Sequence, residues 1–344
     1  MEQKISFNMG FIGIGQGGCK IASSFYEIGY PAIFLNTAEI DLEALDVDTD
    51  LKLVIGETAD GAGKRPEVSM AAVEHSKEDI LGLIRENMDD CDRIIVCAGA
   101  GGGTGSGGCF PVVDLAKEVL GEEGQDRNRV GVIITSPRRL ECASGVVKKN
   151  AKDLLVNACK MCALGEIAPM MILNNRRIKN VVPNATMRNM WEKSNEHVSS
   201  LIHEFNTITQ VPSEFECMDK ADLQTVLLSP GCVSFGASSF MKDSSPQQMK
   251  GTIMSLFTNT MFSHSESDMS QQSYGIILKV PSKVFDEDEG FFERFEQGLE
   301  LVIKSVRGGY IHKGIYEDEE INHPIVYCIS RGIKGPEKRV IQEL

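Results

Sequence analysis

The sequence is poor in aromatic residues, has a single tryptophan and lacks any long apolar run. Of its 344 residues, 6% are aromatic, 24% are charged and 42% are hydrophobic. No apolar stretch reaches the ~20 residues needed to cross a bilayer, which excludes a membrane-spanning chain. The hydrophobic content is also too high for a disordered chain. The length is sufficient for one large core or two packed domains.

An excess of positive charge is also absent, since the formal net charge is -14. A chain this acidic is repelled by nucleic acid and by anionic membranes, so we expect no direct nucleic-acid binding and no membrane insertion. Any contact with DNA would be made through a partner protein. Self-association of many acidic copies would depend on ionic strength and on counterions such as Mg²⁺.

A secretory leader and a disulfide framework are missing as well. The N-terminus, MEQKISFNMG, leads directly into a strand, and the ten cysteines are irregularly spaced. We therefore expect reduced thiols and a cytoplasmic protein. The close pair Cys159 and Cys162 has no second pair or histidine cluster near it, so no metal site is predicted from side chains alone.

The first half alternates short apolar runs with amphipathic stretches, which predicts an α/β domain with a Rossmann-like parallel sheet. The expected strands cover 10–14, 32–35, 51–55, 93–97, 130–135 and 170–173. Ligands of such sheets collect where strands end and helices begin.

The second half starts with a long stretch free of Gly and Pro, 184–208, which we interpret as one connecting helix. The residues beyond Pro212 predict a smaller α/β domain. Its expected elements are a helix from 221, a strand at 233–236, a helix at 247–262, a strand at 274–280, a helix at 289–306 and strands at 310–315 and 325–330. The predicted domains are thus 1–183 for nucleotide binding, 184–211 for the central helix and 212–344 for activation and polymerisation.

A string of glycines, 98–108, stands directly between the strand RIIVC and the helix of FPVVDLAKEVL. Without Cβ atoms, its backbone N–H groups can converge on a polyphosphate at the positive end of the helix. Thr104 and Ser106 can add hydroxyl donors. A flexible linker is the alternative, but linkers do not join a buried strand to an amphipathic helix.

A second glycine loop, 13–18, follows the first strand and also fits the dinucleotide fingerprint G-x-G-x-x-G. An NAD-dependent Rossmann oxidoreductase is therefore the runner-up. Asn36 ends the second strand where NAD binders usually place an acid. A P-loop is excluded because Arg65 follows Gly63-Lys64, and a serine-hydrolase elbow because Thr104 stands two residues before Ser106.

These two loops resemble the tubulin/FtsZ superfamily, whose signature GGGTGSG is complete at 101–107. The resemblance extends along the chain in the family's order, through GIGQGGCK, NTAEIDLEAL, the signature, ITSPRRLE, WEKSN, MDKADLQTVL and SPGCVSFGAS. It implies the tubulin/FtsZ fold, binding of GTP/GDP with Mg²⁺, and GTP hydrolysis. The stretches GAGK and LNNRR, and the absence of a long C-terminal linker, are similar to the plasmid- and phage-borne TubZ group.

The resemblance also implies roles for individual residues. The first phosphate loop would comprise Gly15, Gln16, Gly17 and Gly18, and the second Ala100, Gly101, Gly102, Gly103, Thr104, Gly105 and Ser106. Asn36 and Thr37 would approach the sugar and phosphates, Glu141 would contact the ribose, and Pro137 would be a further nucleotide-binding residue. The γ-phosphate sensor would be Gly61, Ala62, Gly63 and Lys64.

The guanine base would be bound by Trp191, which would stack on it, and by Asn195, which would read its edge. The alternative for Trp191 is a core anchor of the long helix. Lys20 and Asn175 depart from the cell-division members, which have Asn and an acid at these two places. Selection of guanine over adenine therefore rests on the resemblance.

Asp219 and Asp222 match the acids that the family uses to orient the attacking water. The alternative is ordinary helix N-capping by Asp219. Two carboxylates held permanently beside a triphosphate would be repelled, which is a reason to keep them on a neighbouring molecule. Head-to-tail stacking would bring them to the site and build a filament. We expect such a filament to move or position DNA through a DNA-binding adaptor protein, as in plasmid or phage segregation; the alternative within the family is a division-ring protein.

Overall fold

The computed structural model describes residues 4–121, 129–228, 231–241, 243–262, 273–306, 309–333 and 344. The chain divides into two compact units, which are considered separately. The larger unit consists of Phe7–Ser199 with Gly335–Leu344, and the smaller of Met1–Ser6 with Ser200–Lys334. Among the described helices, none is both long and apolar enough to cross a membrane. The predicted limits of the three domains stay a prediction.

The larger unit is built on parallel strands in the order β3-β2-β1-β4-β5-β6. Its strands are β1 (Met9–Ile14), β2 (Ala32–Asn36), β3 (Lys52–Val54), β4 (Arg93–Gly99), β5 (Val130–Ser136) and β6 (Met170–Asn174). The central strands read as continuous apolar runs because both faces of a parallel sheet are covered. Ile12, Val96 and Ile133 are completely buried. The predicted α/β class and the six predicted strands are confirmed.

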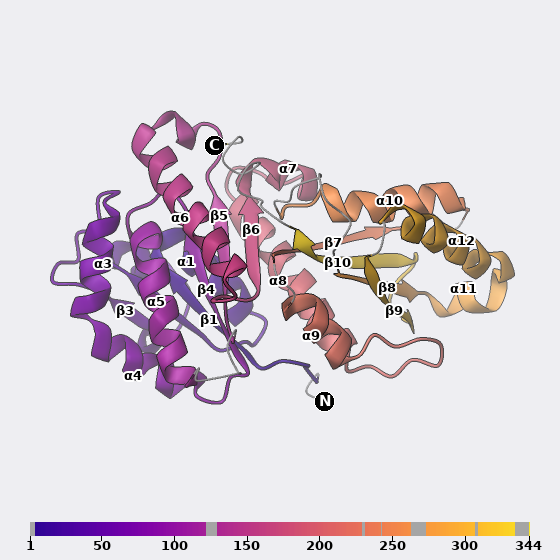
Figure 1. The fold of residues 1–344 in the computed structure, drawn as a ribbon, viewed down its shortest axis with the longest axis horizontal. Coiled ribbons are helices and arrows are strands. Elements are labelled where there is room, and N and C mark those ends of the chain that lie inside the picture. Colours follow the sequence, from indigo (N-terminus) through magenta and orange to yellow (C-terminus); the bar gives the residue numbers. More distant parts are fainter. Residues whose placement is uncertain are drawn as a thin grey trace. The chain divides into compact units, whose positions relative to one another are not determined.

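Each strand of this unit is followed by one or two helices (Figure 1). They are α1 (Gly15–Tyr26), α2 (Glu39–Glu43), α3 (Pro66–His75), α4 (Lys77–Met88), α5 (Thr104–Leu120), α6 (Gly145–Ala163) and α7 (Ile178–Val181). The chain runs outward from β1 to β3 and then returns to the other side of β1 as β4. This reversal between β1 and β4 opens the crevice in which doubly wound sheets bind ligands.

Helix α1 packs so closely on β4 that Gly18 has no room for a side chain. A Cβ at Gly18 would lie 2.0 Å from the carbonyl oxygen of Cys97, whereas a Cβ at Gly82, in exposed α4, would meet nothing within 4 Å. We expect Gly18→Ala to lower the free energy of unfolding by about 1–3 kcal/mol, because backbone must move. Gly82→Ala, the matched control, should raise it by about 0.5–1 kcal/mol. Urea unfolding measures both, and shifts of the same sign would contradict the close approach.

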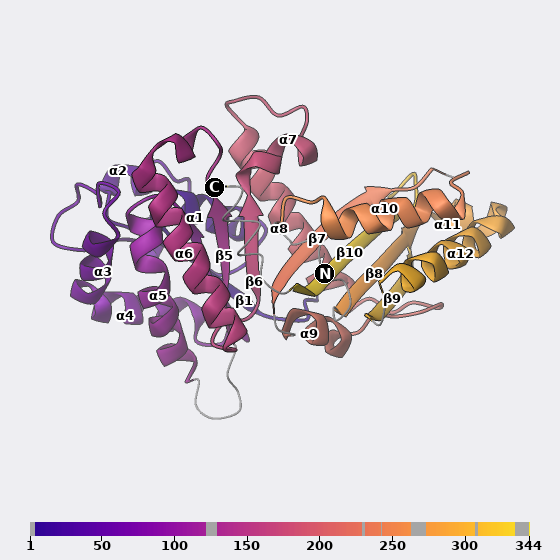
Figure 2. The same cartoon turned by 45° about the horizontal axis from the view of Figure 1, so that its top comes forward.

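The smaller unit has a mixed sheet in the order β7-β10-β8-β9. Strand β10 (Ile325–Ile333) is antiparallel to β7 (Cys232–Ser239) and to β8 (Ser273–Val280), while β9 (Tyr310–Glu317) is parallel to β8. In Figures 1 and 2, α10 (Pro246–Thr258) and α12 (Glu289–Ser305) lie on one face of this sheet and α9 (Lys220–Leu228) on the other. The short α11 (Ser282–Glu287) precedes α12. Every element predicted after Pro212 is present.

The long helix α8 (Met190–Ile208) begins six residues later than the prediction of 184. The Oδ1 atom of Asn189 accepts hydrogen bonds from the backbone N–H of Thr186 at 2.8 Å and from its hydroxyl at 2.9 Å. Such local side-chain bonds compete with the helical backbone pattern and keep the preceding segment in turns. The absence of Gly and Pro alone therefore misplaced the helix start.

Candidate functional site

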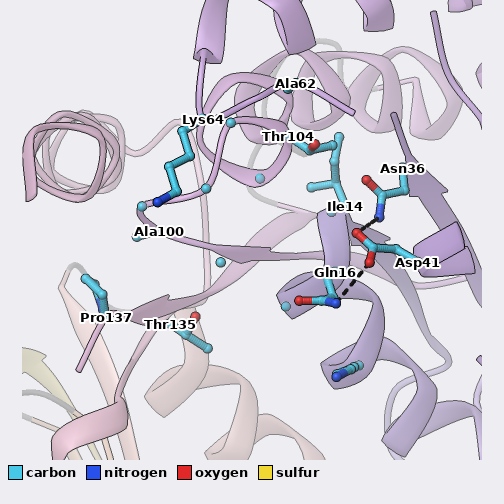
Figure 3. Close-up of a pocket in the computed structure, with 18 of the residues that line it drawn as sticks. Ile14, Gln16, Asn36, Asp41, Ala62, Lys64, Ala100, Thr104, Thr135 and Pro137 are labelled. Atoms are coloured by element: carbon cyan, nitrogen blue, oxygen red, sulfur yellow. Dashed lines mark hydrogen bonds between the residues drawn. The ribbon is translucent and has the colours of Figure 1, made fainter. Parts of the chain in front are cut away.

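A cavity of about 700 Å³ lies in the larger unit, at the carboxyl ends of β1, β2, β4 and β5. Figure 3 shows Gln16, Asn36, Asp41, Lys64 and Thr104 among the side chains that line it. Its volume is in the range of small-molecule sites, and its place at the reversal of strand order is where α/β sheets bind ligands.

Residues of both glycine loops line the cavity. Helix α1 begins in the first loop, at Gly15, and α5 begins in the second, at Thr104. Both helices present N-terminal N–H groups and partial positive charge there. The hydroxyls of Thr37 and Thr104 are 2.8 Å apart and join strand β2 to the second loop. Gly101 has a φ of +110°, which disfavours any residue with a side chain. The cavity is thus built for a polyanion held by main-chain donors.

Asp41, in α2, holds two amide side chains at the edge of the cavity. Its Oδ1 accepts from Gln16 Nε2 at 2.9 Å and its Oδ2 from Asn36 Nδ2 at 3.1 Å (Figure 3). Each carboxylate oxygen therefore accepts one hydrogen bond, and the two amides are fixed in orientation. The sequence analysis did not single out Asp41, since it belongs to neither glycine loop.

The loop 61–64 approaches the second glycine loop from the side of α3. A Cβ at Gly103 would lie 2.7 Å from the Cβ of Ala62 and 2.8 Å from the backbone nitrogen of Arg65. Lys64 has a φ of +63°, an uncommon conformation for a residue with a side chain. Asn150 of α6 donates to the carbonyl of Lys64 at 2.9 Å and to that of Gly101 at 3.4 Å. This buried amide ties the two loops together.

The opposite wall carries Trp191, at the start of α8, and Arg138. The guanidinium carbon of Arg138 lies 5.0 Å from the centroid of the Trp191 ring, a cation–π contact. The backbone N–H of Arg138 donates to Glu141 Oε2 at 2.6 Å. Trp191 is half-buried and lines the cavity, so the alternative of a core anchor loses support. Its stacking on a base stays a prediction.

Asn195 connects α8 to α1 beside this wall. Its Nδ2 donates to the carbonyl oxygen of Lys20 at 3.0 Å, which leaves its Oδ1 as the acceptor available to a ligand. A guanine edge offers two kinds of N–H donor to such an oxygen. Lys20 and Asn175 line the same cavity.

Most of the predicted binding residues come together in this cavity. The exceptions among them are Gly18, Thr37 and Ser106, which are absent from its lining. Gly18 is closed off by its contact with β4, the Thr37 hydroxyl is paired with Thr104, and the Ser106 hydroxyl accepts from the backbone N–H of Gly101 at 3.0 Å. Sequence analysis did not predict the polar lining residues Asp41, Arg138 and Thr135, nor Asn150, which joins two of the loops.

Asp219 and Asp222 lie in the smaller unit, at the start of α9. The side chain of each accepts a hydrogen bond from the backbone N–H of the other. The N–H of Asp222 donates to Asp219 Oδ1 at 2.9 Å, and the N–H of Asp219 donates to Asp222 Oδ2 at 3.2 Å. This is the reciprocal arrangement of a capping box. Asp219 therefore caps the N-terminus of α9, as the alternative to a catalytic role predicted. Asp222 also contacts His312 Nδ1 at 2.6 Å.

The donor set near the glycine loops suits a metal that is shared with a nucleotide. Among the described residues, no cluster of three or more His, Cys, Asp or Glu could hold a metal ion by itself. Mg²⁺ usually takes phosphate oxygens and water, with one or two protein oxygens. The carboxylate of Asp41 and the hydroxyl of Thr104 are hard oxygen donors at this place, so a nucleotide-bound Mg²⁺ fits.

Comparisons with known proteins agree with this geometry. Residues 8–155, which contain both glycine loops, match the Tubulin/FtsZ family, GTPase domain. The chain is 26% identical to the tubulin-like protein TubZ of Bacillus cereus over 251 residues, which cover 68% of this chain and 55% of that protein. It thus spans about half the length of that relative. It is 25% identical to the tubulin-like protein CetZ of Pyrococcus furiosus over 343 residues, covering 97% and 87% of the two chains.

Solved structures extend the likeness to the whole fold. A GTPγS-form protofilament of TubZ from Bacillus thuringiensis serovar israelensis superimposes with a TM-score of 0.81 at 19% identity, covering 99% of this chain and 92% of that one. At this identity the match demonstrates the fold. Residues 8–155 thus match a Tubulin/FtsZ GTPase domain, and the chain has the same fold as the subunit of the solved TubZ protofilament.

Proposed function

We propose that this protein hydrolyses GTP and assembles head to tail into filaments, each active site being completed by acids of the next subunit. The observation that carries the proposal is the state of the carboxylates around the cavity. Among the described residues, the lining contains Asp41 and Glu141 as its acids. Asp41 orients the side-chain amides of Gln16 and Asn36, and Glu141 accepts a hydrogen bond from the backbone N–H of Arg138. Both carboxylates thus hold other groups of the site in place, whereas Asp222 is held by its own neighbours and its side chain is 32% exposed. A further acid is needed to orient the attacking water.

In this mechanism the main-chain N–H groups of the two glycine loops hold the phosphates. Asp41 and Thr104 would hold Mg²⁺ together with the phosphates, and the metal would supply charge neutralisation for the transferring group. Asp222 of the neighbouring subunit accepts a hydrogen bond from water and aligns it with the γ-phosphate. The site works only when two subunits meet, so hydrolysis is coupled to assembly.

A contact that joins unlike surfaces repeats without closing, which produces a filament. The protofilament of a TubZ with the same fold supports this type of assembly. Because the chain carries a net charge of -14, assembly should weaken at low counterion concentration.

The cellular task that we propose is movement or positioning of plasmid or phage DNA in the cytoplasm, through a DNA-binding adaptor. The similarity to TubZ and the charge, which opposes direct DNA binding, support it. The similarity to the cell division protein FtsZ 2 of Methanocaldococcus jannaschii, 28% identical over 231 residues, keeps a division-ring role as the second candidate. The family match weighs against an NAD-dependent oxidoreductase.

The decisive experiment uses the single tryptophan, Trp191, which lines the cavity. Titration with GTP or GTPγS in the presence of Mg²⁺ should change its fluorescence, and sedimentation with electron microscopy should then show filaments. ATP and NAD are the matched controls and should give neither effect at the same concentration. A fluorescence response and polymer with NAD, or none with GTP, would refute the proposal.

Lys64 offers a test of the loop 61–64. Lys64→Gly keeps the positive φ without strain and removes the amine, so we expect GTP affinity to fall by about tenfold, or about 1.4 kcal/mol, while thermal stability is kept or raised. Lys64→Ala, the matched variant, should lose the same affinity without the gain in stability. Trp191 fluorescence titration and thermal unfolding measure the two effects. Unchanged affinity in both variants would show that the amine does not reach the nucleotide.

A further inference from the structure

Strand β9 presents three alternate residues to the loop that carries the acids. His312, Gly314 and Tyr316 are buried, whereas Lys313 and Glu317 between and beyond them are exposed. This alternation places the three buried residues on one face of the strand. Gly314 allows backbone to approach that face, since a Cβ there would lie 3.0 Å from the backbone nitrogen of Met218.

The segment 213–218 runs along the edge of β9 and is bonded to it by main chain and side chains. The N–H of Ile315 donates to the carbonyl of Glu216 at 2.8 Å, and the hydroxyl of Ser213 donates to the carbonyl of Ile315. Lys313 forms an exposed ion pair with Glu216 at 2.7 Å. The acid-bearing loop is therefore anchored before it reaches Asp219.

Tyr316 fixes the residue directly before the acids. Its hydroxyl accepts from the N–H of Met218 at 3.0 Å and donates to the carbonyl of the same residue at 3.2 Å. Burial raises the pKa of Tyr316 to about 12, so the phenol keeps the proton that it donates. The side chain of Met218 is fully buried. The start of α9 thus has a defined position relative to β9.

His312 acts on Asp222 itself. Because a carboxylate only accepts hydrogen bonds, the contact at 2.6 Å places a proton on Nδ1 of His312, which donates to Oδ1. The other oxygen, Oδ2, accepts from the backbone of Asp219. With each oxygen held by a different donor, the plane of the carboxylate is fixed. The Asp222 side chain is 32% exposed and the His312 side chain 8%, so the carboxylate is held from the buried side and open to solvent.

We propose that His312 is a positioning residue for GTP hydrolysis, which holds Asp222 in the orientation that aligns water in the neighbouring subunit's site. This inference rests on the proposed function. The Nε2 atom of His312 is buried and has no hydrogen-bond partner among the described residues. Burial of an unpaired ring nitrogen is a cost that a purely structural residue would avoid. Among the described contacts of His312, the hydrogen bond to Asp222 requires an N–H donor at the place of Nδ1, whereas the ring contact with Tyr310 needs only an aromatic ring.

Two amide substitutions separate positioning from simple stabilisation. His312→Asn places an amide nitrogen near the position of Nδ1 and should keep the bond to Asp222. His312→Gln places its amide farther along the side chain, near Nε2, and should lose the bond although it is also polar. We expect kcat for GTP to fall by about 10–100-fold in His312→Gln and to stay within about threefold in His312→Asn, as for groups that orient reactive ligands. KM and the critical concentration for assembly should change little in either.

Lys313→Met serves as the control on the same strand, because it removes an anchor of the loop without touching Asp222. Its kcat should stay within about twofold of the unchanged protein. Equal kcat values for the Gln and Asn variants, measured per assembled subunit, would overturn the inference. So would a fall in kcat that tracks only thermal stability. Asp222→Ala is measured in parallel. If it keeps full GTP turnover, the proposed function fails. If Asp222→Ala loses turnover while His312→Gln keeps full activity, only the role of His312 is refuted.

Discussion

Asp222→Ala is expected to bind GTP and to assemble, while GTP turnover falls by about 10³-fold. The loss follows because no acid of the neighbouring subunit would align the attacking water, a term worth about 10²–10³ or more in kcat. Binding is retained because the glycine cavity lies in the larger unit and Asp222 in the smaller one. Phosphate release measures turnover, sedimentation measures polymer, and Trp191 fluorescence measures binding.

The substitution also removes part of the cap of α9, which costs about 0.5–2 kcal/mol by itself. Ser245→Ala is the matched control, because Ser245 and Gln248 form a capping box at the start of α10 in the same unit. It should lower stability by a similar amount without changing turnover. Asp222→Asn keeps an oxygen for the cap and removes the charge, so it should lose turnover with less effect on stability. Full hydrolysis in protein kept monomeric by dilution would exclude a shared site.

Much of the fold could be predicted because its strands carry two independent signals. Runs such as 94–99 are apolar throughout and are followed at once by glycine-rich turns and helix starts, so both the type and the position of the element are fixed by the local sequence. The glycine loops are equally local: their function depends on residues without side chains in consecutive positions. These segments of the chain were therefore placed without knowledge of tertiary contacts.

Residues that act through contacts between distant segments could not be found in this way. Asn150 reaches the carbonyl of Lys64 across 86 positions of sequence, and His312 reaches Asp222 across 90. A lone asparagine on an amphipathic helix or a histidine in a strand has no pattern that marks it. Asp41 is similar, since its partner Gln16 lies in a different element. Only the packing of the sheet brings these groups together.

The acids at 219 and 222 illustrate a case in which two interpretations are both valid. Their spacing predicted either a helix cap or a catalytic pair, and the observed geometry satisfies the cap fully. The cap leaves acceptor sites of Asp222 available for water, because a carboxylate offers about four such sites and this side chain is about a third exposed. Capping and catalysis are therefore compatible, and capping contributes the rigidity that catalysis needs.

Gly103→Ala is expected to lower GTP affinity by about 100-fold, or about 2.7 kcal/mol. The added Cβ would lie 2.7 Å from Ala62 and 2.8 Å from the backbone of Arg65, so either the second glycine loop or the loop 61–64 must retreat. Overpacking of this kind costs about 1–3 kcal/mol, and here it displaces the main-chain donors intended for the phosphates. Trp191 fluorescence titration with GTPγS measures the affinity.

The control is Gly145→Ala, at the first residue of α6, where an added Cβ would meet nothing within 4 Å. That variant should bind GTPγS with unchanged affinity. Thermal unfolding without nucleotide separates a local effect from a global one. Gly103→Ala should lower the free energy of binding more than the free energy of unfolding, because the two displaced loops line the cavity and are not part of the sheet. Equal affinities for the two variants would mean that the second glycine loop does not hold the phosphates, and the assignment of the whole site would then fail.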